Sequence, residues 1–291
     1  MEIVLAKTAG FCFGVKRAVD TVYNEINNDR DVEVFTYGPI IHNEEVVNDL
    51  DKKGVVGIDG NKSLSEYFQN DKKHKVIIRS HGVGKHVYDE LEEYGVKIID
   101  ATCPFVKKIH KIVLDNSSED VVTIIAGDCN HPEVKAIKSC AKGESYVVGS
   151  EEELEQLVNL TPYLQTKPII FVSQTTFSIK EWKKTAKKVK LLCTNVKIFD
   201  TICSATEERQ AEALLLSKKN DAMIIIGGKH SSNTRKLYEI CSEKCASTYF
   251  IQTLEDLHLE LPEDAATVGI TAGASTPNNI IEEVQNYVRI N

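Results

Sequence analysis

Three of the eight cysteines in this 291-residue chain recur at a regular spacing. Cys12, Cys103 and Cys203 lie about a hundred residues apart, and the eight residues that end at Cys103 align without a gap with the eight that end at Cys203. Both segments are apolar and β-branched before the cysteine, which predicts a buried strand that leads into a loop. Residues 3–5 are a looser copy before Cys12. Three thiolates delivered from equivalent strand ends could converge on one metal centre.

The chemistry that three thiolates suit is a cubane iron–sulfur cluster with one iron that has no cysteine ligand. Four cysteines complete the usual set, and an open position is the mark of a catalytic metal site. The alternative is that these cysteines are small buried hydrophobic residues, as most cytosolic cysteines are. We favour the metal site because all three share one register. Packing is predicted for the other five, which are Cys129, Cys140, Cys193, Cys241 and Cys245.

Polar residues recur at two further positions of the same repeat. After each cysteine come a helix-like stretch and an apolar strand that ends in glycine, and four positions later stands His42, His131 or Ser231. A third strand follows in each copy. The residues just past it are His81, Thr175 and Ser275. Three marks that recur in order in three copies indicate an internal repeat.

We call these repeated positions marks: the cysteines are the first, His42, His131 and Ser231 the second, and His81, Thr175 and Ser275 the third. The residues at the second and third marks are of the types that bind anions. Residues 231–233 (Ser231, Ser232 and Asn233) open one predicted helix, and residues 274–277 open another. Free N–H groups and hydroxyls at helix N-termini bind phosphate, although the serines could also be simple helix caps. Three histidines at the marks would add donors, and an anion would favour their charged form. A phosphate or diphosphate pocket is therefore plausible.

Glu133 is the candidate proton carrier. Pro132 suits the first turn of a helix, so Glu133 would project from a helix start beside the cavity and could relay protons to a metal-bound substrate. The alternative is a first-turn glutamate that complements the helix dipole. Residues 174–176 could hold the relay or a substrate hydroxyl in place. The chain has no complete glycine motif for a nucleotide, so electrons would have to come from another protein.

The elements that must position these residues alternate between strands and helices, which predicts βαβ units and parallel sheets. Ligands of such sheets bind at the carboxyl ends of the strands, where every mark falls. We predict an α/β protein with three similar lobes in a pseudo-threefold arrangement around a central cavity. The expected lobes are 1–100 (onto which the C-terminal tail could pack back), 101–196 and 197–291. Residues 49–60 and 138–149 are expected to be connections within lobes.

Composition narrows the class of protein. The chain is 42% hydrophobic and 27% charged, which is ordinary for a globular protein. Its net charge of −8 argues against a nucleic-acid surface. It has neither a signal-peptide pattern at the start nor an apolar run of roughly 18 to 20 residues, so we expect a cytoplasmic protein with no membrane association. Thiols in that compartment are more often metal-bound, catalytic or buried than bridged.

At this level of detail the chain resembles a known family, hydroxymethylbutenyl diphosphate reductase (IspH or LytB). The matching motifs are FCFGV at 11–15, YGPIIHN at 37–43, RSHGV at 79–83, DATCP at 100–104, HPEV at 131–134, QTT at 174–176, DTIC at 200–203 and SSNT at 231–234. The resemblance covers essentially the whole chain. It implies a trefoil of three α/β lobes around an oxygen-sensitive [4Fe-4S] cluster. The implied reaction ends the non-mevalonate isoprenoid pathway: two electrons and two protons remove the allylic hydroxyl as water, giving isopentenyl and dimethylallyl diphosphates.

The same resemblance implies roles for the marked residues. Cys12, Cys103 and Cys203 would ligate the cluster and leave one iron open. Glu133 would be the proton source, assisted by Thr175. The diphosphate would be held by His42, His81, Ser231, Ser232, Asn233 and Ser275, with His131 close by. An external donor such as ferredoxin or flavodoxin would supply electrons to a monomer or weak dimer.

Two other functions remain open at this point. A quinolinate-synthase-like [4Fe-4S] dehydratase would also have three lobes and three cysteine ligands, but its dicarboxylate substrate would favour arginines over serine and asparagine at the helix starts. An iron–sulfur redox sensor or carrier would leave Glu133 and the anion pocket without a purpose.

Overall fold

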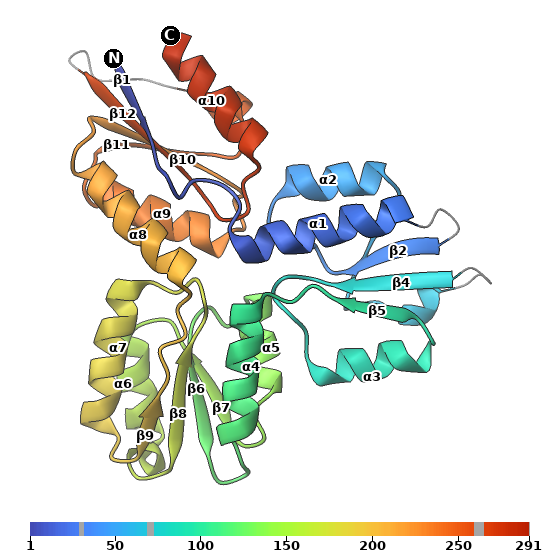
Figure 1. The fold of residues 1–291 in the computed structure, drawn as a ribbon. Coiled ribbons are helices and arrows are strands. Elements are labelled where there is room, and N and C mark those ends of the chain that lie inside the picture. The colour runs from blue at the N-terminus through green and yellow to red at the C-terminus, as the bar shows by residue number, and fades with distance from the viewer. Residues whose placement is uncertain (29–31, 69–72, 259–264, 291) are drawn as a thin grey trace. The chain divides into compact units, whose positions relative to one another are not determined.

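The computed structural model describes residues 1–28, 32–68, 73–258 and 265–290, which form three parallel four-stranded sheets (Figure 1). The first sheet has the order β3 (Val56–Ile58), β2 (Val32–Tyr37), β4 (Lys73–Ile78), β5 (Lys97–Asp100). The second has the order β7 (Ser145–Val148), β6 (Val122–Ala126), β8 (Ile169–Ser173), β9 (Val196–Ile198). The third has the order β1 (Glu2–Leu5), β12 (Thr267–Ala272), β10 (Ala222–Ile226), β11 (Ser247–Ile251). The predicted α/β class with three similar lobes is confirmed.

Helices connect the strands. In chain order they are α1 (Phe13–Asn28), α2 (Glu44–Lys52), α3 (Lys85–Glu93), α4 (Pro104–Asn116), α5 (Pro132–Ser139), α6 (Glu151–Leu160), α7 (Ile179–Leu192), α8 (Ser204–Ser217), α9 (Ser232–Ser242) and α10 (Asn278–Ile290). Short 3-10 helices lie at Leu64–Glu66, Pro162–Gln165 and Leu254–Asp256. Within the described ranges, none of the helices combines the length and the apolar character that a membrane crossing needs.

The second sheet shows why its strands read as continuous apolar runs. Every residue of β6 and β8 is buried, and successive side chains point to opposite faces. Ile124 and Phe171 pack with Leu154 and Trp182 on one face. The other face holds Ile125, Val172, Ile109 and Val134. Figure 1 shows α6 and α7 on the first of these faces and α4 and α5 on the second. A parallel sheet covered on both faces favours apolar residues on both faces of its strands.

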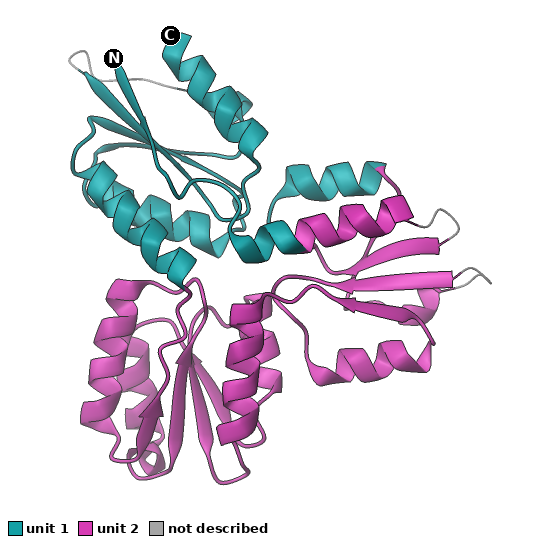
Figure 2. Cartoon of the chain, in the orientation of Figure 1, with its two compact units in different colours: residues 1–17, 41–52, 204–291 teal, residues 18–40, 53–203 magenta. Residues whose placement is uncertain are grey.

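The chain divides into two compact units (Figure 2). Unit 1 comprises residues 1–17, 41–52 and 204–291 and contains the third sheet. Unit 2 comprises residues 18–40 and 53–203 and contains the first and second sheets. The predicted lobe boundaries at residues 100 and 196 stay predictions.

One strand lies in a different sheet from the one its sequence position suggests. β1, expected within the lobe 1–100, pairs in parallel with β12 in the third sheet. Ile3 and Ala9 pack against the core that includes Ile280 and Val284 of α10. The two ends of the chain therefore build one lobe together, because the N-terminal strand joins the C-terminal sheet.

Two short strands lie where only connections were expected. β3 falls within 49–60 and β7 within 138–149, and both are edge strands of their sheets. β3 has three residues, two of them exposed, so it lacks the buried apolar pattern that identifies the central strands.

Candidate functional site

The three marked cysteines occupy equivalent loops. Cys12, Cys103 and Cys203 directly precede α1, α4 and α8, and all three are partly exposed. Each backbone N–H donates to a carbonyl two residues past a central strand. The acceptors are Ala274 after β12 (3.2 Å), Ser80 after β4 (2.9 Å) and Thr175 after β8 (3.2 Å). None of the eight cysteines, all within the described residues, forms a disulfide.

The loops at the second mark are also built alike. Gly38, Gly127 and Gly227 follow β2, β6 and β10, and the N–H of each donates at 2.9 Å to the last residue of the neighbouring edge strand, β3, β7 or β11. Four positions later the chain reaches His42, His131 and Ser231, just before α2, α5 and α9. The marks thus fall at the carboxyl edges of the sheets, as the sequence predicts.

Glu133 lies in unit 2, buried in the first turn of α5 with only 2% of its surface exposed. One carboxylate oxygen, Oε1, accepts the backbone N–H of Thr175 at 2.6 Å. The other, Oε2, accepts the Thr175 hydroxyl at 2.7 Å. Burial raises the pKa of Glu133 to about 7, against the opposing effect of the two Thr175 hydrogen bonds. A carboxyl group with this pKa can hold and release a proton near neutral pH.

Two histidines lie beside this carboxyl group in unit 2. His131 is the N-cap of α5, and its Nδ1 accepts the backbone N–H of Glu133 at 3.2 Å. An accepting Nδ1 carries no proton, so the neutral ring carries its proton on Nε2. The rings of His81 and His131 meet edge to face, with centroids 5.1 Å apart.

A second group of predicted residues meets in unit 1. The hydroxyl of Ser275 donates to the carbonyl of His42 at 3.1 Å and lies 3.5 Å from the hydroxyl of Ser231. Ser231 caps α9 by accepting the N–H of Thr234 at 3.3 Å. Asn233, in the first turn of α9, is 4% exposed, and its Nδ2 finds no hydrogen-bond acceptor among the described residues. A buried amide donor and hydroxyls at a helix N-terminus suit an anion.

The predicted site residues therefore fall into two groups. Unit 1 brings His42, Ser231 and Ser275 together, with Ser232 and Asn233 in the same first turn of α9. Unit 2 brings Glu133, Thr175, His131 and His81 together. Thr175 also links Glu133 to the Cys203 loop, because its carbonyl accepts the Cys203 N–H. The roles of all these residues stay predictions.

Comparison with known proteins identifies the family. The model of the LytB protein family matches residues 3–289. The chain belongs to the LytB protein family. It is 46% identical over 289 residues to the 4-hydroxy-3-methylbut-2-enyl diphosphate reductase of Thermoanaerobacter pseudethanolicus, with 99% of this chain and 97% of that protein covered. It is 38% identical over 288 residues to the Clostridioides difficile protein of the same name, with 99% of each chain covered.

Solved structures agree with the family assignment. This LytB chain is similar to a structure of (E)-4-hydroxy-3-methyl-but-2-enyl diphosphate reductase, described as the terminal enzyme of the non-mevalonate pathway, with 38% identity, a TM-score of 0.67 and 100% of each chain covered. It is also similar to the E-1-hydroxy-2-methyl-but-2-enyl-4-diphosphate reductase of Plasmodium falciparum, with 26% identity and a TM-score of 0.85 over 99% of this chain and 87% of that one. The resemblance drawn from the motifs is confirmed.

Two charged residues of α8 belong to the surroundings of Cys12 in this LytB protein and were not predicted. Arg209 donates to the backbone of Gly10, and Glu212 accepts from the backbone of Lys7 and Thr8. The sequence gives no signal that a charged residue of a helix binds a loop about two hundred positions away in the chain.

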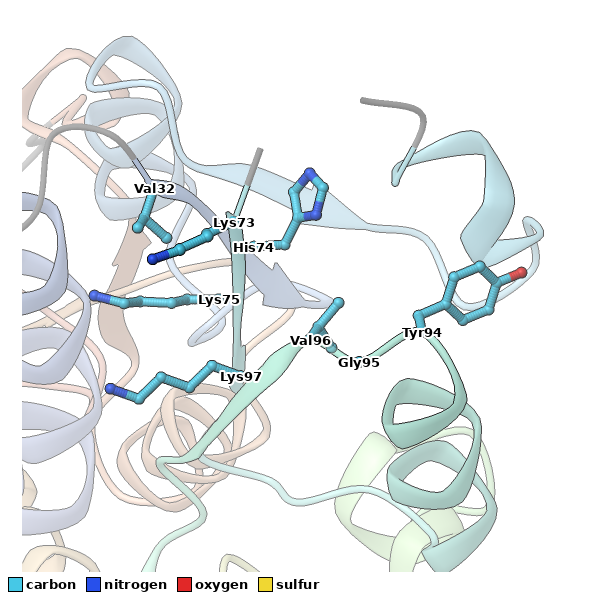
Figure 3. A pocket seen from close by; sticks show the side chains of 8 residues that line it. All are labelled: Val32, Lys73, His74, Lys75, Tyr94, Gly95, Val96 and Lys97. Atoms are coloured by element: carbon cyan, nitrogen blue, oxygen red, sulfur yellow. The ribbon is translucent and has the colours of Figure 1, made fainter. Parts of the chain in front are cut away.

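A cavity of about 470 Å³ in the LytB chain lies away from the predicted residues (Figure 3). Its lining comes from the amino ends of β2, β4 and β5 and from the end of α3, namely Val32, Lys73, His74, Lys75, Tyr94, Gly95, Val96 and Lys97. Figure 3 shows the three lysines extending to the same side, where Lys75 pairs with Glu25 at 3.0 Å. Because the marked residues lie at the carboxyl edges, this cavity is not part of the candidate site.

Proposed function

We propose that this LytB protein reduces 4-hydroxy-3-methylbut-2-enyl diphosphate to isopentenyl and dimethylallyl diphosphates, the last step of the non-mevalonate pathway. The observation that carries the proposal is the buried pair of Glu133 and Thr175. Thr175 binds the carboxyl group with two donors and the Cys203 N–H with its carbonyl. A proton source thus adjoins the loop of a proposed cluster ligand, which a reductive loss of water requires.

The cofactor of the proposed reaction is one [4Fe-4S] cluster ligated by Cys12, Cys103 and Cys203. The donor set fits this group, because three partly exposed thiols stand at corresponding positions, each directly before a helix. Three ligands leave one iron open. Such a cluster supplies single electrons and a Lewis-acidic iron for the hydroxyl oxygen of the substrate.

The remaining marked residues bind the substrate and handle protons in this proposal. Hydroxyl, amide and imidazole donors hold the diphosphate, and their proposed members are His42, His81, Ser231, Ser232, Asn233 and Ser275, with His131 close by. Glu133 gives up a proton as the allylic hydroxyl leaves as water. Thr175 orients that carboxyl group with its hydroxyl and its backbone N–H.

Partners and location follow from the same chemistry. The reaction takes up two electrons, so we propose an external donor such as ferredoxin or flavodoxin, acting on a monomer or weak dimer. We place the enzyme in the cytoplasm, because cysteines that stay unbridged are typical of a reducing compartment.

Turnover by the anaerobically reconstituted protein tests the proposed function. Iron and sulfide are counted first, and hydroxymethylbutenyl diphosphate is then added with a reduced low-potential donor. Both diphosphate products are expected. An intact cubane cluster without consumption of the substrate would overturn the proposal. In that case, turnover of a dicarboxylate would favour the dehydratase, and cluster transfer or a change of state without turnover would favour a carrier or sensor.

The rate of turnover should depend on pH through Glu133. Proton donation needs the neutral carboxyl group, whose pKa is raised by burial to about 7. Turnover should therefore be highest on the acidic side of this pKa and fall about tenfold per pH unit above it, if this ionisation alone limits the rate. The measurement is kcat against pH with the substrate saturating.

Thr175→Val provides the matching test of this pH profile. The Thr175 hydroxyl favours the ionised carboxylate, so its removal should raise the pKa of Glu133 and move the falling limb to higher pH. The backbone N–H remains as a donor. If turnover falls at the same pH in the wild type and in Thr175→Val, a group other than Glu133 controls the pH dependence.

A further inference from the structure

The segment that carries Cys12 is the longest of the three cysteine loops. Cys12 stands seven positions after the end of β1, whereas Cys103 stands three positions after β5 and Cys203 five after β9. Each further loop residue must be ordered at an entropic cost. The Cys12 loop therefore needs more stabilising contacts than the other two loops to keep a single conformation.

The shorter loops are also held by side-chain hydrogen bonds, and those named next join residues that are closer in the sequence. Before Cys103, Asp100 accepts the N–H of Thr102 through Oδ1 at 2.9 Å. Before Cys203, the Thr201 hydroxyl accepts the N–H of Ser173 at 2.7 Å and donates to its carbonyl at 2.8 Å. These contacts bridge at most 28 positions of sequence.

The Cys12 loop is held instead by a buried arginine of α8. Arg209 is 4% exposed and donates through Nη2 to the carbonyl of Gly10 at 2.6 Å and through Nη1 to that of Ala272 at 3.0 Å. Two positions beyond these carbonyls, the N–H of Cys12 donates to the carbonyl of Ala274. The rigid guanidinium fork thus sets the separation of the two backbone segments just before they join at Cys12.

A carboxylate on the same helix holds the start of this loop. Glu212 lies three positions after Arg209 and accepts the N–H groups of Lys7 and Thr8, both at 2.9 Å, and the Thr8 hydroxyl at 2.6 Å. Burial disfavours ionisation of this carboxyl group, but the hydrogen bonds from Thr8 and Lys7 outweigh it and lower its pKa. Glu212 is therefore an ionised acceptor for three donors at neutral pH.

We propose that Arg209 and Glu212 are positioning residues, a two-point clamp on α8 that fixes the Cys12 loop in the geometry required of a cluster ligand. The assignment of Cys12 as a ligand rests on the proposed function; the clamp itself rests on the five hydrogen bonds. α8 begins directly after Cys203. One helix thus starts at one proposed ligand and holds the loop of another.

Hydrogen exchange of the full-length chain tests the clamp without reference to activity. Arg209→Met and Glu212→Gln should accelerate amide exchange in residues 6–12 by about tenfold, because each removes charge-assisted hydrogen bonds to that segment. Exchange around Cys103 and Cys203 should change less than about twofold. Arg209→Lys keeps one charged donor without the fork and should lie between wild type and Arg209→Met.

Glu208→Gln is the matched control, since Glu208 is exposed on the same helix and should leave the exchange unchanged. Iron release to a chelator from the anaerobically loaded protein is the second measurement, and the clamp variants should release iron about tenfold faster than this control. Equal acceleration around all three cysteines would show general destabilisation and overturn the clamp. Unchanged exchange in residues 6–12 would also overturn it. A wild-type protein without reductase turnover would defeat the proposed function and leave the exchange result to decide the clamp.

Discussion

Replacement of Glu133 by glutamine is expected to lower kcat by about a hundredfold or more, while iron content and diphosphate binding stay as in the wild type. Glutamine keeps the size of the side chain but has no acidic proton. Its amide oxygen can still accept the N–H of Thr175, which in the wild type binds Oε1 at 2.6 Å. The Thr175 hydroxyl can turn and accept from the new amide group. The loss should therefore be chemical and not structural.

The matched control for Glu133→Gln is Glu152→Gln. Glu152 also stands in the first turn of a helix, α6, but is exposed. If Glu133 served only to complement a helix dipole, both variants would lose a similar, small amount of stability and keep full turnover. Burial of Glu133 argues against that role, because an exposed carboxylate complements a helix dipole without the cost of moving its charge out of water. Full turnover in Glu133→Gln would remove this residue from the proton path.

Thermal unfolding of Glu133→Gln against pH gives an independent control. The folded state raises the pKa of this carboxyl group from 4.5 to about 7, so the folded chain binds more protons than the unfolded chain between these values. The stability contributed by neutral Glu133 is complete below pH 4.5 and is lost as the pH rises through 7. Glutamine does not ionise, so the variant should lack this part of the decline. The same decline in both proteins would mean that the pKa of Glu133 is not raised.

The repeat predicted the positions of the site residues because its physical basis is local. Parallel strands place their carboxyl ends at one edge of a sheet, so residues at fixed offsets from strand ends fall at that edge. The Cys103 and Cys203 loops obey this rule within single sheets. Glu133 and Thr175 follow β6 and β8, which are hydrogen-bonded neighbours, and their contact follows from this pairing.

The partner of β1 could not be predicted in the same way. A short, mainly apolar segment predicts a strand but not the sheet that the strand joins, and the residues of β1 are only partly buried or exposed. β1 pairs with β12, near the other end of the sequence, and Ile3 of β1 packs against the core that the third sheet forms with α10. Arg209 and Glu212 escaped prediction because the buried face of α8 is mostly polar, so apolar periodicity does not mark it, and because a sequence does not show that a charged pair binds residues 7–10.

Cys103→Ala is expected to abolish the cluster, whereas Cys193→Ala should keep iron and sulfide at the wild-type level. Cys103 is partly exposed and directly precedes α4, as Cys12 and Cys203 directly precede α1 and α8. Cys193 is 3% exposed in the core around Phe171 and Trp182, and burial raises the pKa of its thiol. A buried neutral thiol is a poor metal ligand. Iron and sulfide are counted after anaerobic reconstitution of both variants.

Measuring stability alongside iron separates ligation from packing in these two variants. Cys193→Ala removes a buried sulfur and should destabilise the chain by about 1 kcal/mol while the cluster remains. Cys103→Ala removes a partly exposed side chain, so without the cluster it should unfold at nearly the same temperature as cluster-free wild type. Cys12→Ala and Cys203→Ala should also lose the cluster, since each of these cysteines is partly exposed and directly precedes a helix. Equal loss of iron from Cys193→Ala and Cys103→Ala would overturn the choice of ligands, because a core thiol would then matter as much as one in the repeated register.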